Sequence, residues 1–194
     1  MKLEHDLILK GGRVIDPMQG LDAVRDIAFN GGRVSAIAES LDVTSAKRVE
    51  DISRKILSPG LLDLHTHVYW GGTGLGVKAE PVARRSGTTT FIDAGSAGAG
   101  NYAGFQSFIA DPTPLNIYGF LNISFAGICG FSCTTPNLFP ECEDIRLLDT
   151  AECVRTAREY AHSVVGIKVR IGRYASGNAG LIPLQIAREV AEEL

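Results

Sequence analysis

After Pro59-Gly60 the chain alternates apolar, strand-like runs with helix-like stretches at intervals of roughly thirty residues. That interval is typical of βα units whose strands form a parallel sheet. Four strand-like runs follow this spacing, at 61–68, 88–94, 115–124 and 164–171. A parallel sheet needs helices on its faces, and the stretches between the runs can supply them. We therefore expect the second part of the chain to fold as α/β.

Residues 1–57 carry a different pattern, in which short apolar runs are separated by turn-forming residues. Gly11-Gly12, Asp16-Pro17 and Asn30-Gly31-Gly32 separate the runs, and such combinations are typical of β-hairpin turns. We expect β-hairpins over 1–57 and a separate α/β segment over 58–194. A closed (β/α)8 barrel takes ~250 residues, so this chain holds only about four of its eight units.

Local signals mark the ends of two expected helices. Gly87 is placed to end a helix that opens at Glu80-Pro81, because glycine readily adopts the left-handed conformation of a helix C-terminus. Asp149 can cap a second helix, because its carboxylate can accept hydrogen bonds from the N–H groups of the first turn. Both helices lie between strand-like runs, as βα units require.

The composition argues against several kinds of partner. Lys and Arg number 19 and Asp and Glu number 22, giving a formal charge of −3 without a basic cluster, so we expect no nucleic-acid partner. No apolar run approaches the ~20 residues of a membrane span, and the acidic N-terminus is unlike a signal peptide. We expect a cytoplasmic protein with a small-molecule ligand, and homo-oligomerisation stays open. Four cysteines lack metal-site spacing and are expected to be buried or loop thiols: Cys129, Cys133, Cys142 and Cys153.

The strongest chemical signal is Asp63-Leu64-His65-Thr66-His67 at the end of the first strand-like run. Residues two apart on a strand point to the same side, so His65 and His67 share one face. Neutral imidazole is a common metal ligand, and active sites form at the carboxyl ends of parallel strands. The glycine-rich segment 71–76 lacks nucleotide-binding spacing and is typical of an active-site loop. The competing interpretation is an ordinary polar pair at a strand end.

The run at 164–171 gives the second signal. Strict alternation places Lys168 and Arg170 on one face, which in a barrel is the interior, and an apolar, helix-packing face on the other: Val165, Ile167, Val169 and Ile171. A lysine in a barrel must be paired, deprotonated or chemically altered. A neutral lysine amine can react with CO2 to give a carbamate, an anionic ligand able to bridge two metal ions. The alternative is an open strand from which Lys168 reaches water.

These residues together resemble the amidohydrolase superfamily of metal-dependent hydrolases, in its dihydroorotase-like and deacetylase-like branch. The matching segments are 11–17, 59–67, Ser86-Gly87-Thr88-Thr89-Thr90 and Gly166-Ile167-Lys168, and the resemblance covers all 194 residues. It implies a (β/α)8 (TIM) barrel of the amidohydrolase type, of which about the first four βα units are present. It also implies a small β-sandwich to which residues 1–57 contribute.

The resemblance further implies a site with two divalent metal ions, usually zinc. By position, His65 and His67 would bind the more buried ion, and Lys168, as a CO2-derived carbamate, would bridge both. The family draws two more histidines and a general-base aspartate from later strands, and none of these three lies in this chain. The implied reaction is attack of a metal-bridging hydroxide on a carbonyl that is polarised by one ion.

The members of this branch differ in the substrates that they cleave. Dihydroorotases place a carboxylate-binding arginine two residues after the histidine pair, where this chain has Tyr69. Residues 67–74 are more similar to deacetylases, which cleave acetyl esters or amides of small hydroxy or amino acids. Tyr69 and Trp70 are candidates to line the pocket, with plain packing as the alternative, and Asp93 is a candidate to support a metal ligand. Arg170 is a candidate to hold a substrate carboxylate, and the alternative is that it pairs with an acidic neighbour in the barrel. A cyclic amidase, similar to dihydroorotase or hydantoinase, and a non-catalytic barrel relative are the alternatives.

Overall fold

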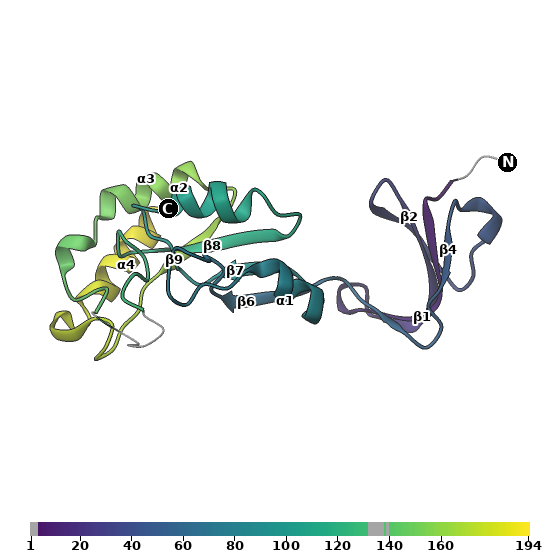
Figure 1. Cartoon of the computed structure of the whole chain (residues 1–194), viewed down its shortest axis with the longest axis horizontal. Helices are drawn as coiled ribbons and strands as arrows, with labels where there is room; N and C mark the ends of the chain where they lie inside the picture. The colour runs from purple at the N-terminus through teal and green to yellow at the C-terminus, as the bar shows by residue number, and fades with distance from the viewer. Residues whose placement is uncertain (1–3, 132–137, 139) are drawn as a thin grey trace. The chain divides into compact units, whose positions relative to one another are not determined.

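The computed structural model describes residues 4–131, 138 and 140–194. It divides into two compact units, Met1–Pro59 and Gly60–Leu194 (Figure 1). Within the described residues no helix is both long enough and apolar enough to span a membrane. Of the cysteines, Cys142 and Cys153 are buried and Cys129 is an exposed thiol, while Cys133 lies outside the described residues.

The first unit is a five-stranded sheet with two short 3-10 turns. Its order is β3-β2-β1-β4, and β5 also pairs with β1. The first three strands are antiparallel, whereas β4 and β5 run parallel to β1. The predicted turns at Asp16-Pro17 and Asn30-Gly31-Gly32 are confirmed, because each joins two antiparallel neighbours. The strands are β1 (Leu7–Asp16), β2 (Leu21–Asn30), β3 (Arg33–Ala38), β4 (Val49–Asp51) and β5 (Ile56–Leu57), and the turns are η1 (Pro17–Gln19) and η2 (Val43–Ser45).

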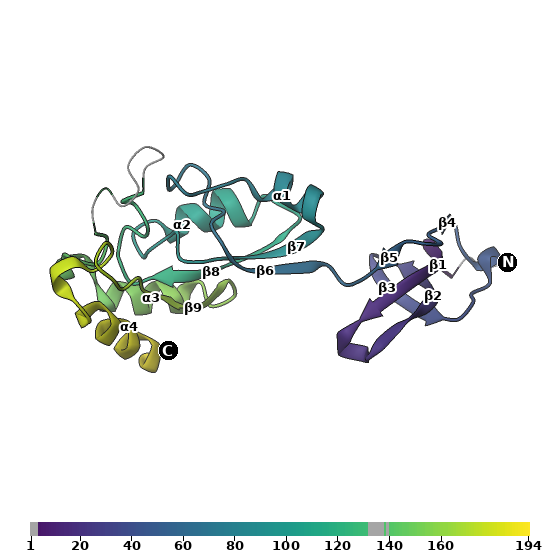
Figure 2. The same cartoon turned by 90° about the horizontal axis from the view of Figure 1, so that it is seen from below.

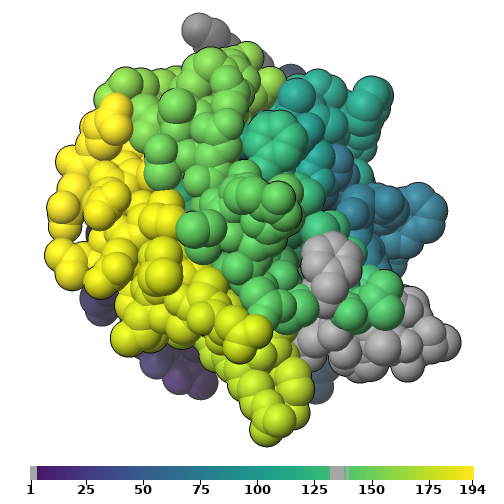
Figure 3. Space-filling model, turned by 90° about the vertical axis from the view of Figure 1, so that its left-hand side faces the viewer, coloured from purple at the N-terminus to yellow at the C-terminus, as the bar shows by residue number. Residues whose placement is uncertain are grey.

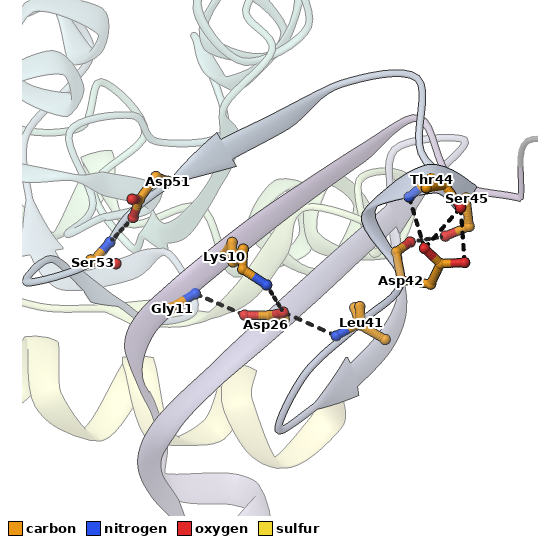
Figure 4. Close-up of polar contacts among 9 residues, drawn as sticks. All are labelled: Lys10, Gly11, Asp26, Leu41, Asp42, Thr44, Ser45, Asp51 and Ser53. Carbon is orange, nitrogen blue, oxygen red and sulfur yellow. Dashed lines mark hydrogen bonds and ion pairs between the residues drawn. The ribbon is translucent and has the colours of Figure 1, made fainter.

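The prediction that Gly11-Gly12 forms a hairpin turn is wrong. Strand β1 continues through this pair with a shift in its pairing to β2, and Gly11 has a φ of 74°. The buried carboxylate of Asp26 accepts hydrogen bonds from the N–H of Gly11 (2.8 Å) and from the N–H of Leu41 (3.0 Å) (Figure 4). The glycine pair therefore forms a β-bulge that is held from the neighbouring strand.

The second unit is a four-stranded parallel sheet with helices between its strands, as predicted. The order β6-β7-β8-β9 follows the chain, so each strand lies beside the next one in sequence (Figure 2). The strands are β6 (Leu61–Thr66), β7 (Thr88–Asp93), β8 (Asn116–Asn122) and β9 (Val164–Lys168). The helices are α1 (Ala79–Ser86), α2 (Tyr102–Phe105), α3 (Thr150–Glu159) and α4 (Ile182–Glu193), with a π-helix η3 (Gln106–Ala110) and 3-10 turns η4 (Ile145–Leu147) and η5 (Gly177–Ala179).

Both predicted helix ends are confirmed. Gly87 follows α1 in the left-handed conformation, with a φ of 75°. Asp149 precedes α3, and its side chain accepts a hydrogen bond of 3.0 Å from the N–H of Glu152. Gly87 thus separates α1 from β7, and Asp149 sets the first turn of α3.

The core of the second unit packs the sheet against the helices. Phe91 of β7 and Leu121 of β8 are fully buried and form one cluster with Tyr102 and Phe105 of α2 and with Val190 of α4. Strand β6 lies at one edge of the sheet. Its apolar side chains are largely exposed: Leu61, Leu62 and Leu64 are 54%, 52% and 70% exposed.

The expected alternation along 164–171 holds only in part. The pairing of β8 with β9 shifts between Gly119 and Phe120, so Val164 packs on the core and Val165 is exposed. The strand ends at Lys168, and Ile171 is also exposed. A bulge reverses the alternation on one side of it. The prediction is therefore wrong for Val165 and Ile171, whereas Ile167 and Val169 do pack on the core.

Candidate functional site

The candidate site lies at the carboxyl ends of the four parallel strands. Asp93, Asn122 and Lys168 are the last residues of β7, β8 and β9, and Thr66 is the last residue of β6. The pairing sets Thr66 beside Asp93 and Asn122 beside Lys168. Figure 3 views the second unit from the side toward which these strands run. Active sites of parallel α/β folds form at this end.

The two histidines lie together, as the sequence predicts. The ring centroids of His65 and His67 are 5.7 Å apart, and the rings meet edge to face at 76°. The Nδ1 atom of His67 shares a hydrogen bond of 2.9 Å with the hydroxyl of Ser96 in the segment after β7. This bond orients the ring and leaves Nε2 as the nitrogen that is available to coordinate a metal ion.

Burial and neighbouring cationic groups favour the neutral form of His67. Desolvation lowers the pKa of His67, His65, Lys168 and Arg170 lower it further, and Asp93 opposes them. A lowered pKa favours the neutral imidazole near pH 7, which is the form that binds metal ions. The electrostatics therefore suit a ligand role for His67.

Asp93 joins the segments that carry the histidine and its hydrogen-bond partner. Its carboxylate is buried and accepts hydrogen bonds from the N–H of Val68 (2.8 Å) and from the N–H of Ser96 (2.6 Å). Val68 follows His67 directly, and Ser96 contacts the His67 ring. Asp93 thus holds the backbone on both sides of the contact between His67 and Ser96.

Lys168 lies against a glycine that leaves room for it. Gly95 has a φ of 84°, and a Cβ atom at this position would collide with the Cβ and Cγ atoms of Lys168. Burial lowers the pKa of Lys168, Arg170 adds to this effect, and Glu141 and Asp93 oppose it. The neutral amine, which is the form that reacts with CO2, is therefore easier to reach than on an exposed lysine.

Glu141 is a buried member of this cluster that the sequence does not reveal. It is 2% exposed, and its Oε2 atom accepts a 2.9 Å hydrogen bond from Arg170, whose guanidinium also lies 4.7 Å from the ring centroid of Phe131. Desolvation raises the pKa of Glu141, opposed by Arg170, Asn122 and Lys168. No periodic pattern surrounds Glu141, because it lies in an irregular segment.

Comparison with known proteins connects this geometry to a family. No protein-family model matches the chain. The chain is 32% identical over 170 residues to a deacetylase of Agrobacterium fabrum, covering 87% of the chain and 40% of that protein. It is 33% identical over 174 residues to a deacetylase of Brucella anthropi, covering 89% of the chain and 42% of that protein. A dihydroorotase crystal structure superposes with a TM-score of 0.82 at 27% identity, covering 96% of this chain and 48% of that one.

The chain belongs to the amidohydrolase superfamily. It falls in the branch that contains deacetylases and dihydroorotases, as the sequence motifs predict. This amidohydrolase chain spans about two fifths of the length of the two curated deacetylases. Among the residues that the structure describes, no three His, Cys, Asp or Glu side chains gather as a metal-binding group.

The two aromatic candidates of this amidohydrolase, Tyr69 and Trp70, have no hydrogen bond or ring contact with the histidine pair or Lys168 within the described part of the chain. Tyr69 donates a hydrogen bond of 3.2 Å to the carbonyl of Asn101, and its ring meets that of Phe105 edge to face at 5.5 Å. Trp70 is 54% exposed, with the ammonium of Lys78 4.3 Å from its ring centroid. It lines a separate groove with residues of α1 and η3. The structure therefore brings His65, His67, Asp93, Lys168 and Arg170 to one end of the sheet and gives the two aromatic residues different surroundings.

Proposed function

We propose that this chain forms part of a metal-dependent hydrolase that cleaves an acetyl ester or amide of a small hydroxy or amino acid. The observation that carries the proposal is the placement of two adjacent imidazoles and a desolvated lysine at one end of a parallel sheet. The similarity to two bacterial deacetylases supports the choice of reaction.

The same proposal includes the architecture of the whole protein. We propose that the four parallel strands form the first half of a (β/α)8 barrel and that the N-terminal sheet contributes to a β-sandwich. The exposed leucines of β6 support this, because an apolar edge strand requires cover by further strands or helices.

The donor set fits a metal site that this chain supplies only in part. His65 and His67 would hold the more buried ion, and Lys168, as a carbamate, would hold both. Divalent ions, with zinc as the expected metal, would activate water and polarise the scissile carbonyl. Ser96 orients the His67 ring, Asp93 fixes the backbone around that contact, and Gly95 leaves the path for the lysine side chain.

Carbamate formation is proposed as a reaction of the lysine amine alone. The neutral Nζ of Lys168 attacks the carbon of CO2, the new N–C bond forms as one C=O electron pair moves to oxygen, and one proton leaves the nitrogen for water. Desolvation of this amine assists the step, because it favours the neutral form before attack.

A cyclic amide is the second candidate substrate. The superposition with a dihydroorotase at a TM-score of 0.82 favours this class of reaction. Tyr69 argues against dihydroorotase itself, because the resemblance implies that a dihydroorotase would have a carboxylate-binding arginine at this position. Both candidate reactions need the same metal ligands, so only an assay with different substrates distinguishes them.

The test combines metal analysis with a substrate panel on the full-length protein. Wild type should contain two divalent ions and hydrolyse acetylated amino or hydroxy acids faster than dihydroorotate or hydantoins. His65→Ala should lose the buried ion, and Lys168→Ala should lose the two-ion stoichiometry. His162→Ala is the matched control, because His162 is exposed and follows α3. Full metal content and activity in His65→Ala would refute the ligand assignment, and faster turnover of the cyclic amides would select the second candidate.

A further inference from the structure

We propose that the loop after β9 binds the carboxylate of the substrate and that Arg173 is the residue that pairs with it. The inference rests on the proposed function and adds to it the residue that recognises the free carboxylate of the acetylated acid. Three observations support this inference: the loop is held by hydrogen bonds, a cavity adjoins it, and the Arg173 guanidinium lies near the Tyr174 ring.

The base of this loop is firmly attached. The buried hydroxyl of Ser176 accepts a hydrogen bond of 3.2 Å from the N–H of Gly172, and the carbonyl of Ala175 accepts one of 2.8 Å from the N–H of Cys142. The N–H of Asn178 donates to a carboxylate oxygen of Glu143 at 3.0 Å. A loop that is closed by one internal hydrogen bond and tied to residues 142 and 143 by two more loses little conformational freedom when a ligand binds.

The tip of the loop presents two side chains beside a cavity. A cavity of about 400 Å³ is lined by residues 169–175, which begin directly after Lys168. This volume lies within the range of small-molecule sites. Arg173 and Tyr174 are exposed, and the guanidinium carbon of Arg173 lies 5.9 Å from the Tyr174 ring centroid. The loop, yellow-green in Figure 3, projects on the side where the strands end.

The charges select Arg173 over its neighbour Arg170. Arg170 already pairs with the buried carboxylate of Glu141 at 2.9 Å. Among the described side chains, none with a carboxylate forms an ion pair with Arg173. A guanidinium binds a carboxylate through two parallel hydrogen bonds, and the Tyr174 ring offers an apolar surface beside it. The loop therefore offers a carboxylate a guanidinium with no carboxylate partner among the described side chains, next to an aromatic ring.

The experiment compares each acid with its neutral amide. The substrates are N-acetylalanine and O-acetyl-lactate, each with its primary amide, and the full-length enzyme is assayed as wild type, Arg173→Gln and Arg173→Lys. Wild type should favour each acid by about 10- to 100-fold in kcat/KM, the ratio that one charge-assisted hydrogen-bond pair supplies. Arg173→Gln should lose this preference through KM, with the amides unchanged, and Arg173→Lys should recover part of it.

Arg188→Gln is the matched control, because Arg188 lies on α4 and pairs only with the exposed Glu192 among the described residues. An equal loss for acid and amide in Arg173→Gln, or no preference in a wild type that hydrolyses both, would overturn the inference and leave the proposed hydrolase standing. If wild type hydrolyses no substrate of either kind, the proposed function fails. Calorimetric titration of N-acetylalanine then decides the inference: binding that is lost in Arg173→Gln upholds it, and binding that is absent or unchanged refutes it.

Discussion

Replacing Gly95 by alanine tests the contact that positions Lys168. Gly95 has a φ of 84°, and the added Cβ would collide with the Cβ and Cγ atoms of Lys168. The left-handed conformation alone costs an alanine about 1–2 kcal/mol, and forced overpacking adds about 1–3 kcal/mol. The lysine must also move, so the proposed second ion should be lost together with stability.

Gly87→Ala provides the matched control. Gly87 has a similar φ of 75°, and a Cβ at this position would meet nothing within 4 Å. It should therefore show the conformational cost without the collision. The assay is urea unfolding of both variants together with metal analysis. Equal losses of stability, with the metal content of Gly95→Ala unchanged, would refute the argument that Gly95 is required by Lys168.

Three further outcomes follow from the buried polar groups. Because burial holds the pKa of His67 below its usual value of about 6.5, the unfolded chain binds the proton more readily there. The free energy of unfolding is therefore highest above the unfolded pKa of about 6.5 and falls as the pH drops through the folded pKa. The free energies of unfolding at pH 7.5 and 5.5 should differ more in wild type than in His67→Gln. Equal differences in the two proteins would contradict a lowered pKa of His67. Asp93→Asn should lower the free energy of unfolding by about 1–3 kcal/mol, because one of the two N–H groups bound by Asp93 loses its acceptor. A loss under about 0.5 kcal/mol, the size of a typical surface substitution, would show that the asparagine still accepts both hydrogen bonds. Glu141→Gln should lower the free energy of urea unfolding by about 1–3 kcal/mol, less than for a fully buried pair because its partner Arg170 is 26% exposed. Glu192→Gln, in the exposed pair with Arg188, should change it little. Equal effects of the two substitutions would argue against a buried charge pair at Glu141.

The elements that sequence patterns predict are those set by local chemistry. Gly87 ends a helix because glycine tolerates a φ of 75°, and Asp149 begins another because its carboxylate reaches the N–H of Glu152. The histidine pair follows from the two-residue repeat of a single strand. Each of these predictions needs only neighbouring residues.

The features that the sequence does not predict depend on distant partners. Gly11 forms a bulge because Asp26, fifteen residues away, accepts its N–H. Val165 is exposed because the pairing of β9 with β8 shifts at that point. Glu141 enters the site through Arg170, which is twenty-nine residues away. Alternation and turn patterns contain no information about such pairings.

The charges at the strand ends constrain how the proposed carbamate could form. Lys168 and Arg170 carry two positive charges, and Asp93 and Glu141 carry two negative charges, so the cluster is balanced when all four are ionised. Converting the ammonium to a carbamate changes the charge of this cluster by two and leaves it at about −2 in a desolvated setting. Divalent cations would offset that charge, so carbamylation and metal binding should be coupled. Carbon-13 NMR of protein exposed to labelled CO2 should show the carbamate signal with metal present and lose it after chelation, in wild type and not in Lys168→Ala. A signal of equal intensity in the chelated protein would show that the four side chains tolerate the charge by themselves.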